Sequence, residues 1–235
     1  MMKERLDKYV SSQTALSRKE AQKAIKEKRV LLNGTVVRAA DTKVDTECDS
    51  VSLDGQPLTY QEYVYYMMDK PGGVVSATKD SQERTVLDLL PPEWRRDGLF
   101  PAGRLDKDTT GLLLITDDGE FAHRMLSPKK HVQKRYIATL DREPDDSIVA
   151  AFEAGIVLGD GTVCKSGQAE ILGGCRVAVV ISEGKYHQVK RMFAALGYHV
   201  EALRRVRIGG LALDEGSKPG EVRVLTAEEA AAVFD

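Results

Sequence analysis

The stretch FPAGRLDKDTTGLLLIT, residues 100–116, decides the fold. Its end, residues 112–116, is a continuous apolar run typical of a strand buried on both faces. The residues before that run are rich in Gly, Asp and Thr, which predicts an open loop ending at a core strand. Because a rigid scaffold presents such loops to solvent, Asp106 and Asp108 are candidate functional carboxylates. The competing interpretation is that either aspartate only caps a turn.

The segments around this loop alternate irregularly between strand and helix patterns. Strands are expected at 63–68, 135–140, 169–172 and 176–182, and helices at 85–90, 121–126 and between residues 182 and 198. The last helix carries apolar residues at i, i+3, i+4 and i+7, from Val189 to Leu196. Several turns are too short for the crossovers that parallel strands need. We therefore expect an α+β fold with a mixed, mostly antiparallel sheet and helices packed on it.

Residues 1–58 have a pattern of their own. Ser17 and Glu20 fit a capping box at a helix start. The helix that follows has small and apolar residues on one side and four cations on the other: Arg18, Lys19, Lys23 and Lys26. Asn33-Gly34 between β-forming residues predicts a hairpin, and Asp54-Gly55 predicts another turn. We expect a small domain over 1–58, a polar linker over 59–62 and a second domain over 63–235.

The charge of the chain is distributed unevenly. The 235 residues include 34 basic and 36 acidic ones, and this net charge of −2 argues by itself against a nucleic-acid partner. Residues 1–38, however, carry +6, which leaves −8 on the rest. Residues 121–136 and 185–207 are two further basic runs, and the first of them contains no acidic residue. For any one run the alternative is a solvated surface, but the asymmetry predicts an anion-binding N-terminal module.

Several classes of protein are disfavoured by what the sequence lacks. No apolar run approaches the ~18 residues of a membrane span, and the N-terminus has no stretch of the signal-peptide kind. Three scattered cysteines indicate reduced thiols in a cytoplasm rather than disulfides or a zinc site. Nucleotide-binding, serine-hydrolase and zinc-protease motifs are absent. His123 and His131 have no identifiable partner ligands, so we expect no metal.

The loop motif also resembles the signature of a known enzyme family. Gly103-Arg104-Leu105-Asp106-x-x-Thr109-x-Gly111, followed by three leucines, is similar to the pattern of the RsuA/RluA-type pseudouridine synthases. Three further motifs of that family appear in order: Lys70-Pro71-x-Gly73, Lys134-Arg135-Tyr136, and EGKYHQVKRM at 183–192. Residues 5–9 through 33–34 resemble an S4 RNA-binding domain. The resemblance covers nearly the whole chain and is strongest to the small-subunit (16S) ribosomal RNA branch.

This resemblance implies the isomerisation of one uridine in RNA to pseudouridine. The uracil leaves the RNA stack before it reacts. Asp106 is implied as the catalytic aspartate, although attack on ribose C1′, attack on uracil C6 and a glycal route all stay open. Lys190 is implied as the cation that favours an ionised aspartate, and Tyr136 as the residue that stacks on the flipped base. Because bond cleavage and rejoining are redox-neutral, we expect no cofactor.

Two further groups of residues are expected to hold the RNA. The expected substrate-binding residues are Arg104, Lys185, His187, Gln188 and Arg191, with Arg191 as a phosphate contact. The expected contacts of the N-terminal module are Arg5, Arg18, Lys19, Lys23 and Lys26. The expected partner is small-subunit ribosomal RNA or an assembly intermediate, with no membrane, and the expected state is a cytoplasmic monomer.

Three other functions stay open at this point. The first is the same reaction on large-subunit (23S) ribosomal RNA. The second is a non-catalytic, S4-type RNA-binding assembly factor that keeps the fold. The third is a carboxylate-dependent glycosidase, which would need a second catalytic acid or base.

Overall fold

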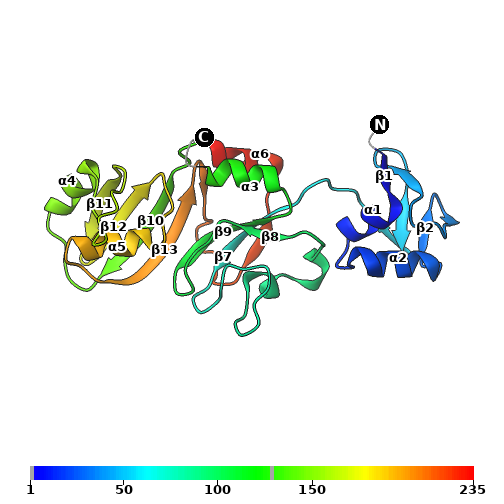
Figure 1. Cartoon of the computed structure of the whole chain (residues 1–235), viewed down its shortest axis with the longest axis horizontal. Coiled ribbons are helices and arrows are strands. Elements are labelled where there is room, and N and C mark those ends of the chain that lie inside the picture. Colours follow the sequence, from blue (N-terminus) through cyan, green and yellow to red (C-terminus); the bar gives the residue numbers. More distant parts are fainter. Residues whose placement is uncertain (1–2, 128–129) are drawn as a thin grey trace. The chain divides into compact units, whose positions relative to one another are not determined.

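The computed structural model describes residues 3–127 and 130–235, which belong to two compact units (Figure 1). The N-terminal unit comprises the described residues up to Val64 together with Leu89–Phe100, and the C-terminal unit comprises Tyr65–Asp88 and Pro101–Asp235. Lys129 of the basic run at 121–136 lies outside the described residues. None of the described helices combines the length and apolar character that crossing a membrane requires.

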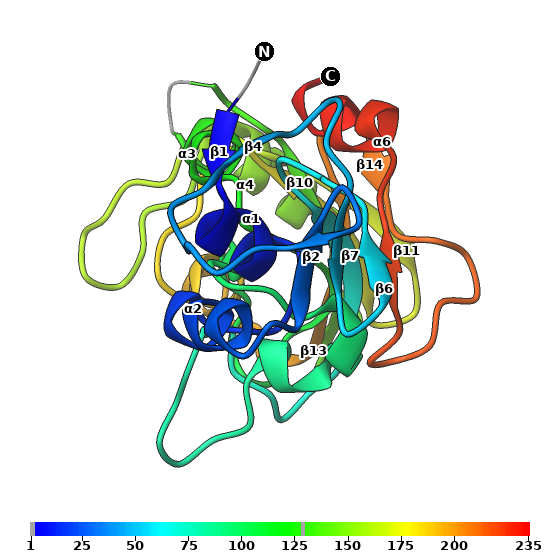
Figure 2. The ribbon, with the colours of Figure 1, turned by 90° about the vertical axis from the view of Figure 1, so that its right-hand side faces the viewer.

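The N-terminal unit packs two short helices on small sheets. Its helices are α1 (Leu6–Ser12) and α2 (Arg18–Lys26), which lie side by side in Figure 2. Its strands are β1 (Lys3–Arg5), β2 (Val30–Leu32), β3 (Thr35–Val36), β4 (Lys43–Asp45), β5 (Val51–Leu53) and β6 (Gln56–Leu58). Strand β1 pairs with β4, and the other four form a sheet in the order β3-β2-β5-β6. A 3₁₀ turn at Pro92–Trp94 belongs to the second segment of this unit.

The local signals in this unit are confirmed. The backbone N–H of Ser17 donates to Glu20 Oε2 at 2.8 Å, and the Ser17 hydroxyl accepts from the Glu20 N–H, which completes the capping box. Asn33 and Gly34, both with positive φ, connect β2 to β3 as the predicted hairpin. In α2 the small and apolar residues are buried in the core and the four cations are exposed. The helix therefore separates a packing face from a cationic face, as its sequence predicts.

The C-terminal unit is built on a nine-stranded sheet with the path β11-β12-β10-β13-β9-β7-β15. The strands are β7 (Tyr65–Lys70), β8 (Phe100–Ala102), β9 (Thr110–Thr116), β10 (Lys134–Leu140), β11 (Gln168–Gly173), β12 (Arg176–Ile181), β13 (Val200–Ile208), β14 (Leu211–Ala212) and β15 (Val222–Val224). Strands β9 and β13 run parallel, whereas β10 is antiparallel to both of its neighbours, and so is β7. The expected α+β fold with a mixed, mostly antiparallel sheet is confirmed.

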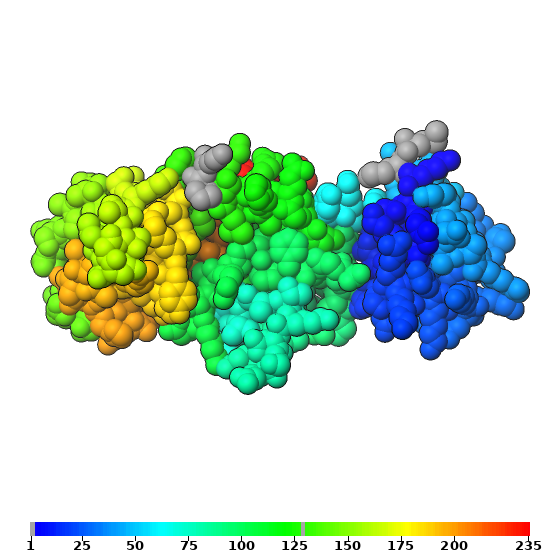
Figure 3. Space-filling view, viewed as in Figure 1, coloured from blue at the N-terminus to red at the C-terminus, as the bar shows by residue number. Residues whose placement is uncertain are grey.

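In the described part of this unit, four helices accompany the sheet: α3 (Gly119–Leu126), α4 (Ser147–Ala154), α5 (Gln188–Ala195) and α6 (Ala227–Ala231). The predicted apolar face of α5 is buried, and its Phe193 ring lies 5.3 Å from the Phe152 ring of α4. Figure 3 shows the orange residues around α5 next to the yellow-green residues around α4. The helix expected at 85–90 is a 3₁₀ turn at Val86–Leu89. Strand β13, the longest in the sheet, lies where the sequence shows a basic run.

Strands β9 and β13 meet over a short parallel contact. Two residue pairs make up their register, Arg204 with Thr110 and Arg205 with Gly111. Gly111 has φ +98°, and a Cβ atom at this position would lie 2.2 Å from the backbone oxygen of Arg205. A real side chain cannot occupy that space, so glycine is required for the two strands to approach. Strand packing therefore explains why the 103–111 motif ends in a glycine, Gly111.

We expect Gly111→Ala to lower the free energy of unfolding by about 2 kcal/mol more than Gly173→Ala. The two glycines are a matched pair, because Gly173 has φ +99° but no atom within 4 Å of an added Cβ. Both variants therefore have the same backbone strain, and the difference isolates the contact with β13. Urea unfolding of both variants measures it, and equal losses would contradict the packing argument.

Candidate active site

The loop before β9 is anchored by the buried ammonium group of Lys70. Its Nζ donates hydrogen bonds to the backbone oxygens of Pro71 at 3.0 Å, Lys107 at 3.1 Å and Thr109 at 2.9 Å. Lys70 lies at the end of β7 and is fully buried. Burial lowers its pKa to about 8, although Asp108 and Asp106 raise it. The lysine of the first sequence motif thus fixes the backbone on both sides of Asp108.

A second anchor holds the residue immediately before Asp106. The buried hydroxyl of Ser76 donates to the backbone oxygen of Leu105 at 2.9 Å and lies 3.1 Å from the Leu105 nitrogen, which donates to it. The backbone N–H of Gly73 donates to Lys107 O at 2.8 Å. Asp106 is therefore flanked by fixed backbone, while its own side chain is 28% exposed. A carboxylate on a rigid loop that solvent can reach is suited to act on a bound substrate.

His187 is the residue that contacts this carboxylate. Its Nε2 lies 3.4 Å from Asp106 Oδ1. His187 precedes the first residue of α5 and has a left-handed backbone conformation with φ +48°. This conformation sets the direction of the side chain at the point where the loop turns into the helix. The structure therefore brings together two of the residues that the sequence nominates.

Lys190 pairs with Asp108 rather than with Asp106. Its Nζ lies 2.7 and 2.6 Å from the two carboxylate oxygens of Asp108. The hydrogen bond from Lys190 lowers the pKa of Asp108 below its ordinary value. Lys190 thus carries its positive charge to the loop that holds Asp106, but the carboxylate that it binds is two residues further along. Asp108 is thus paired with the ammonium group of Lys190 on α5, and Asp106 is in contact with the imidazole of His187 just before that helix.

Tyr136 lies on β10, directly across from Arg205 on β13. The tyrosine is buried, and the central carbon of the buried Arg205 guanidinium is 6.0 Å from its ring centre. Arg205 also pairs with Gly111, so Tyr136, Arg205 and Gly111 form a row across three adjacent strands. The loop with Asp106 leads into that row. The sheet therefore connects Tyr136, through Arg205 and Gly111, to the strand that follows the Asp106 loop. Among the described residues, no contact is recorded between the side chains of Tyr136 and Asp106.

The sequence and fold of this chain are similar to those of known proteins. The profile of the RNA pseudouridylate synthase family matches residues 64–195, and that of the S4 domain matches residues 4–59. The chain belongs to the RNA pseudouridylate synthase family. The ribosomal small subunit pseudouridine synthase A of Escherichia coli K12 is 45% identical over 97% of this chain and 99% of its own.

Two other relatives cover the same length. An uncharacterized RNA pseudouridine synthase of Bacillus subtilis, YtzG, is 44% identical over 96% of both chains. A crystal structure of a pseudouridylate synthase matches with a TM-score of 0.69 and 40% identity over 97% of this chain and 99% of that one. These matches identify an RNA pseudouridine synthase with an S4 domain, and they favour this enzyme over a non-catalytic RNA-binding factor.

The other expected substrate-binding residues of the synthase differ in accessibility. Arg104 is exposed on the loop. Gln188 is buried, where its Nε2 donates to Glu183 Oε1 at 2.6 Å and its Oε1 accepts from the Lys185 N–H at 2.8 Å. The Lys185 ammonium also pairs with Glu183, and Arg191 pairs with Asp160. Gln188 therefore holds the turn before α5 together, and the two cations have internal partners.

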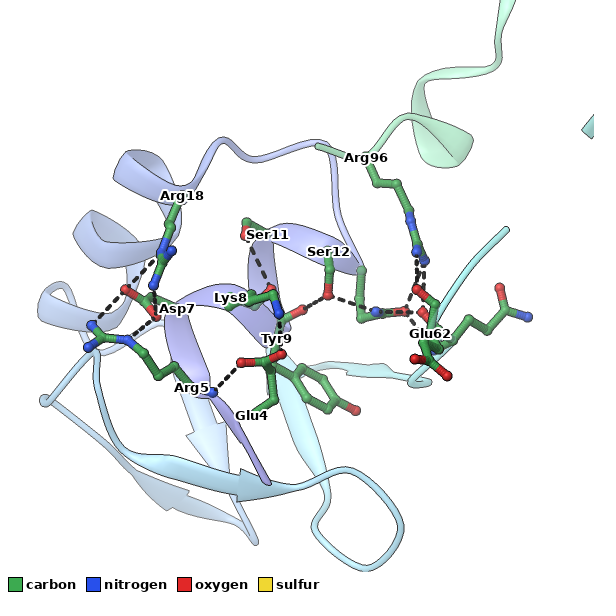
Figure 4. A network of polar contacts seen from close by, with 12 residues as sticks. Glu4, Arg5, Asp7, Lys8, Tyr9, Ser11, Ser12, Arg18, Glu62 and Arg96 are labelled. Atoms are coloured by element: carbon green, nitrogen blue, oxygen red, sulfur yellow. Dashed lines mark hydrogen bonds and ion pairs between the residues drawn. The ribbon is translucent and has the colours of Figure 1, made fainter. Parts of the chain in front are cut away.

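In the N-terminal unit, the expected RNA contacts fall into two groups. Arg5 and Arg18 both donate to the buried carboxylate of Asp7, at 3.1 and 3.3 Å (Figure 4), and Gln22 donates at 2.8 Å. Burial opposes the charge of Asp7, but these hydrogen bonds hold its pKa well below its usual range. The second group, Lys19, Lys23 and Lys26, is exposed on α2. One buried carboxylate thus fixes two arginines, and three lysines project into solvent.

Three residues of the synthase site are not nominated by sequence reasoning. Lys70 and Lys134 stand in quoted motifs without a role, and Arg205 stands in a basic run. Lys134 is buried on the same face of β10 as Tyr136, and burial and the Arg205 charge lower its pKa to about 8. A lysine within a strand pattern is the signal that could have identified it. Among residues 3–127 and 130–235 no group of three His, Cys, Asp or Glu is arranged to hold a metal.

We expect Ser76→Ala to lower the free energy of unfolding by about 1–3 kcal/mol, because the N–H and C=O of buried Leu105 lose their partner. The exposed Ser81 of the same segment provides the control, and Ser81→Ala is expected to change stability by less than about 0.5 kcal/mol. Urea unfolding monitored by fluorescence measures both. A Ser76→Ala enzyme as stable as Ser81→Ala would show that the hydroxyl does not hold the loop.

Proposed function

We propose that this synthase converts one uridine of small-subunit (16S) ribosomal RNA to pseudouridine. The observation that carries the proposal is the 45% identity to ribosomal small subunit pseudouridine synthase A over nearly the full length of both chains. The S4 domain over residues 4–59 supports RNA as the partner. We further propose that the enzyme acts in the cytoplasm as a monomer, away from any membrane, and that its domains divide at the 59–62 linker.

In this proposal Asp106 is the catalytic carboxylate. The reaction breaks the bond between ribose C1′ and uracil N1, forms a bond from C1′ to C5, releases the C5 proton to water and leaves a proton from water on N1. A carboxylate can serve this sequence as a nucleophile or as a base. The anchors at Ser76 and Lys70 support the role, because they fix the loop while the Asp106 side chain stays accessible. The target uridine leaves the RNA stack to reach it.

Tyr136 and Lys190 complete the proposed catalytic group. Tyr136 stacks on the flipped uracil, and its place on β10, across from Arg205 and in one row with Gly111 at the start of the strand that the Asp106 loop enters, supports this role. Lys190 supplies positive charge to the loop that holds Asp106. Its pairing with Asp108 supports this role by holding the ammonium group beside the loop before RNA arrives.

The remaining residues grip the phosphates of the RNA. Arg5 and Arg18 are pre-arranged by Asp7, so their guanidinium groups are ordered before binding. The lysines of α2 add exposed charge, and Lys23 has an exposed carboxylate partner in Glu27 at 3.8 Å. Around the active site, Arg104 and Arg191 serve the same purpose, with Lys185 and His187 at the turn before α5. Gln188, proposed from the sequence as a substrate contact, is buried and holds that turn together instead. Such contacts position the RNA and contribute little sequence reading.

Carbodiimide–primer extension on ribosomal RNA from a deletion strain tests the substrate. We expect the loss of a single pseudouridine in 16S RNA, restored by the wild-type gene. Loss of a site in 23S RNA instead would assign the enzyme to the large subunit. An unchanged modification pattern in both RNAs would refute a ribosomal substrate.

Asp106→Asn should abolish pseudouridine formation and leave RNA binding within about twofold, because the amide keeps the shape of the side chain but cannot act as nucleophile or base. Asp108→Asn is the matched control on the same loop, and we expect it to retain measurable turnover. Tritium release from 5-[³H]uridine RNA measures the rate, and filter binding measures affinity. Product from Asp106→Asn at the wild-type rate would remove Asp106 from the mechanism.

Replacing Lys19, Lys23 and Lys26 together with Gln should weaken RNA binding and reduce the slope of log K against log salt by about 2, at roughly 0.7 per lost phosphate contact. The control is Lys218→Gln, which removes an exposed charge from the C-terminal unit. Filter binding between low and moderate salt measures the slope. A triple variant with the wild-type slope would show that this face of α2 does not contact phosphates.

A further inference from the structure

Tyr186 is an exposed aromatic residue next to the catalytic loop. Its side chain is 76% exposed, the largest exposed fraction among the large apolar side chains of the described residues. It precedes His187 and lies in the turn that leads into α5. Exposing an aromatic ring to water is unfavourable, so a ring in this place calls for an explanation.

The Tyr186 ring is held by the residue that contacts Asp106. Its centre lies 3.8 Å from the centre of the His187 ring, and the two planes are within 17° of each other. His187 in turn places Nε2 at 3.4 Å from Asp106 Oδ1. The two rings therefore form a stack that begins at the proposed catalytic carboxylate and ends in solvent. The left-handed backbone of His187 fixes the start of that stack.

The neighbouring cations do not account for the exposed ring. Lys185, Lys190 and Arg191 are paired with Glu183, Asp108 and Asp160, respectively. A cation–π contact is described for other rings of the chain but not for Tyr186 within the described residues. What this part of the surface, beside the Asp106 loop, offers to a ligand is thus the flat aromatic ring of Tyr186.

We propose that Tyr186 stacks against the nucleobase next to the target uridine in the bound RNA. This inference rests on the proposed function. When the uridine leaves the stack, the base beside it loses a stacking partner, which is part of the cost of flipping. An aromatic side chain replaces that partner whatever the base, because every base has a π-face. His187 positions the ring, and Tyr136 remains the residue for the flipped uracil itself.

The geometry also distinguishes this role from a purely structural one. A ring that only shields His187 could be replaced by any apolar side chain of similar size. Stacking on a base needs a planar π-surface, so Phe should replace Tyr186 and Leu should not. The pair Tyr186→Phe and Tyr186→Leu therefore separates the two roles, while both keep an apolar cover on the imidazole.

The first measurement is steady-state kinetics on the small-subunit RNA transcript. Tyr186→Leu should raise KM about tenfold, the loss expected for one base–aromatic stack, with a much smaller change in kcat. Tyr186→Phe should restore KM to within about twofold. A KM for Tyr186→Leu equal to that of the wild type, or equal losses in both variants, would overturn the inference.

The second measurement is photocrosslinking with 5-iodouridine placed on either side of the target uridine. We expect one of the two positions to crosslink to the peptide that contains Tyr186, and the crosslink to disappear in Tyr186→Leu. Crosslinks from both positions to other peptides would overturn the inference. The result is separable from the proposed function, because a wild-type enzyme that makes no pseudouridine in this RNA fails in the product assay, whereas a wrong role for Tyr186 leaves that product intact.

Discussion

The short parallel contact between β9 and β13 is the constraint on which the C-terminal unit depends. On one side of it lie β11, β12 and β10, and on the other lie β7 and β15. The proposed catalytic residues come from both sides, since the Asp106 loop enters β9 while Tyr136 is on β10 and α5 precedes β13. Gly111 allows the two backbones to approach, and without that approach the halves of the site would stand apart. The Asp108–Lys190 pair and the Asp106–His187 contact cross the same junction.

Features that depend on neighbours in the sequence could be predicted from it. The buried strand expected at 112–116, which the structure extends to Thr110–Thr116, the capping box at Ser17 and the apolar face of α5 follow from local pattern. Strand β13 could not be predicted, because its three arginines are typical of a charged, solvent-exposed surface. In the fold Arg205 is buried, where its Nε donates to Leu112 O at 2.8 Å, and Arg204 pairs with the buried Asp69. Only the sheet order creates those partners.

The same limit applies to the site. The family resemblance nominates Asp106, His187 and Lys190, and the structure places all three around one loop. The sequence could not predict that Lys190 pairs with Asp108 rather than with Asp106, because from α5 it can reach either carboxylate of the loop. The backbone of His187, with its positive φ, decides which side chain faces Asp106. Likewise, the +6 charge of residues 1–38 counts Arg5 and Arg18 as if they were free, although Asp7 holds both.

The anchors of the Asp106 loop act on its main chain. Ser76 bonds the N–H and C=O of Leu105, and Lys70 bonds the carbonyl groups of Lys107 and Thr109. No side chain of Lys107 is needed for these bonds, and its ammonium group pairs with Glu83 at the surface. The position of the loop is thus independent of the identity of that residue. Evolution, or a protein engineer, can vary the surface of the loop to suit a different RNA without displacing the carboxylate beside it.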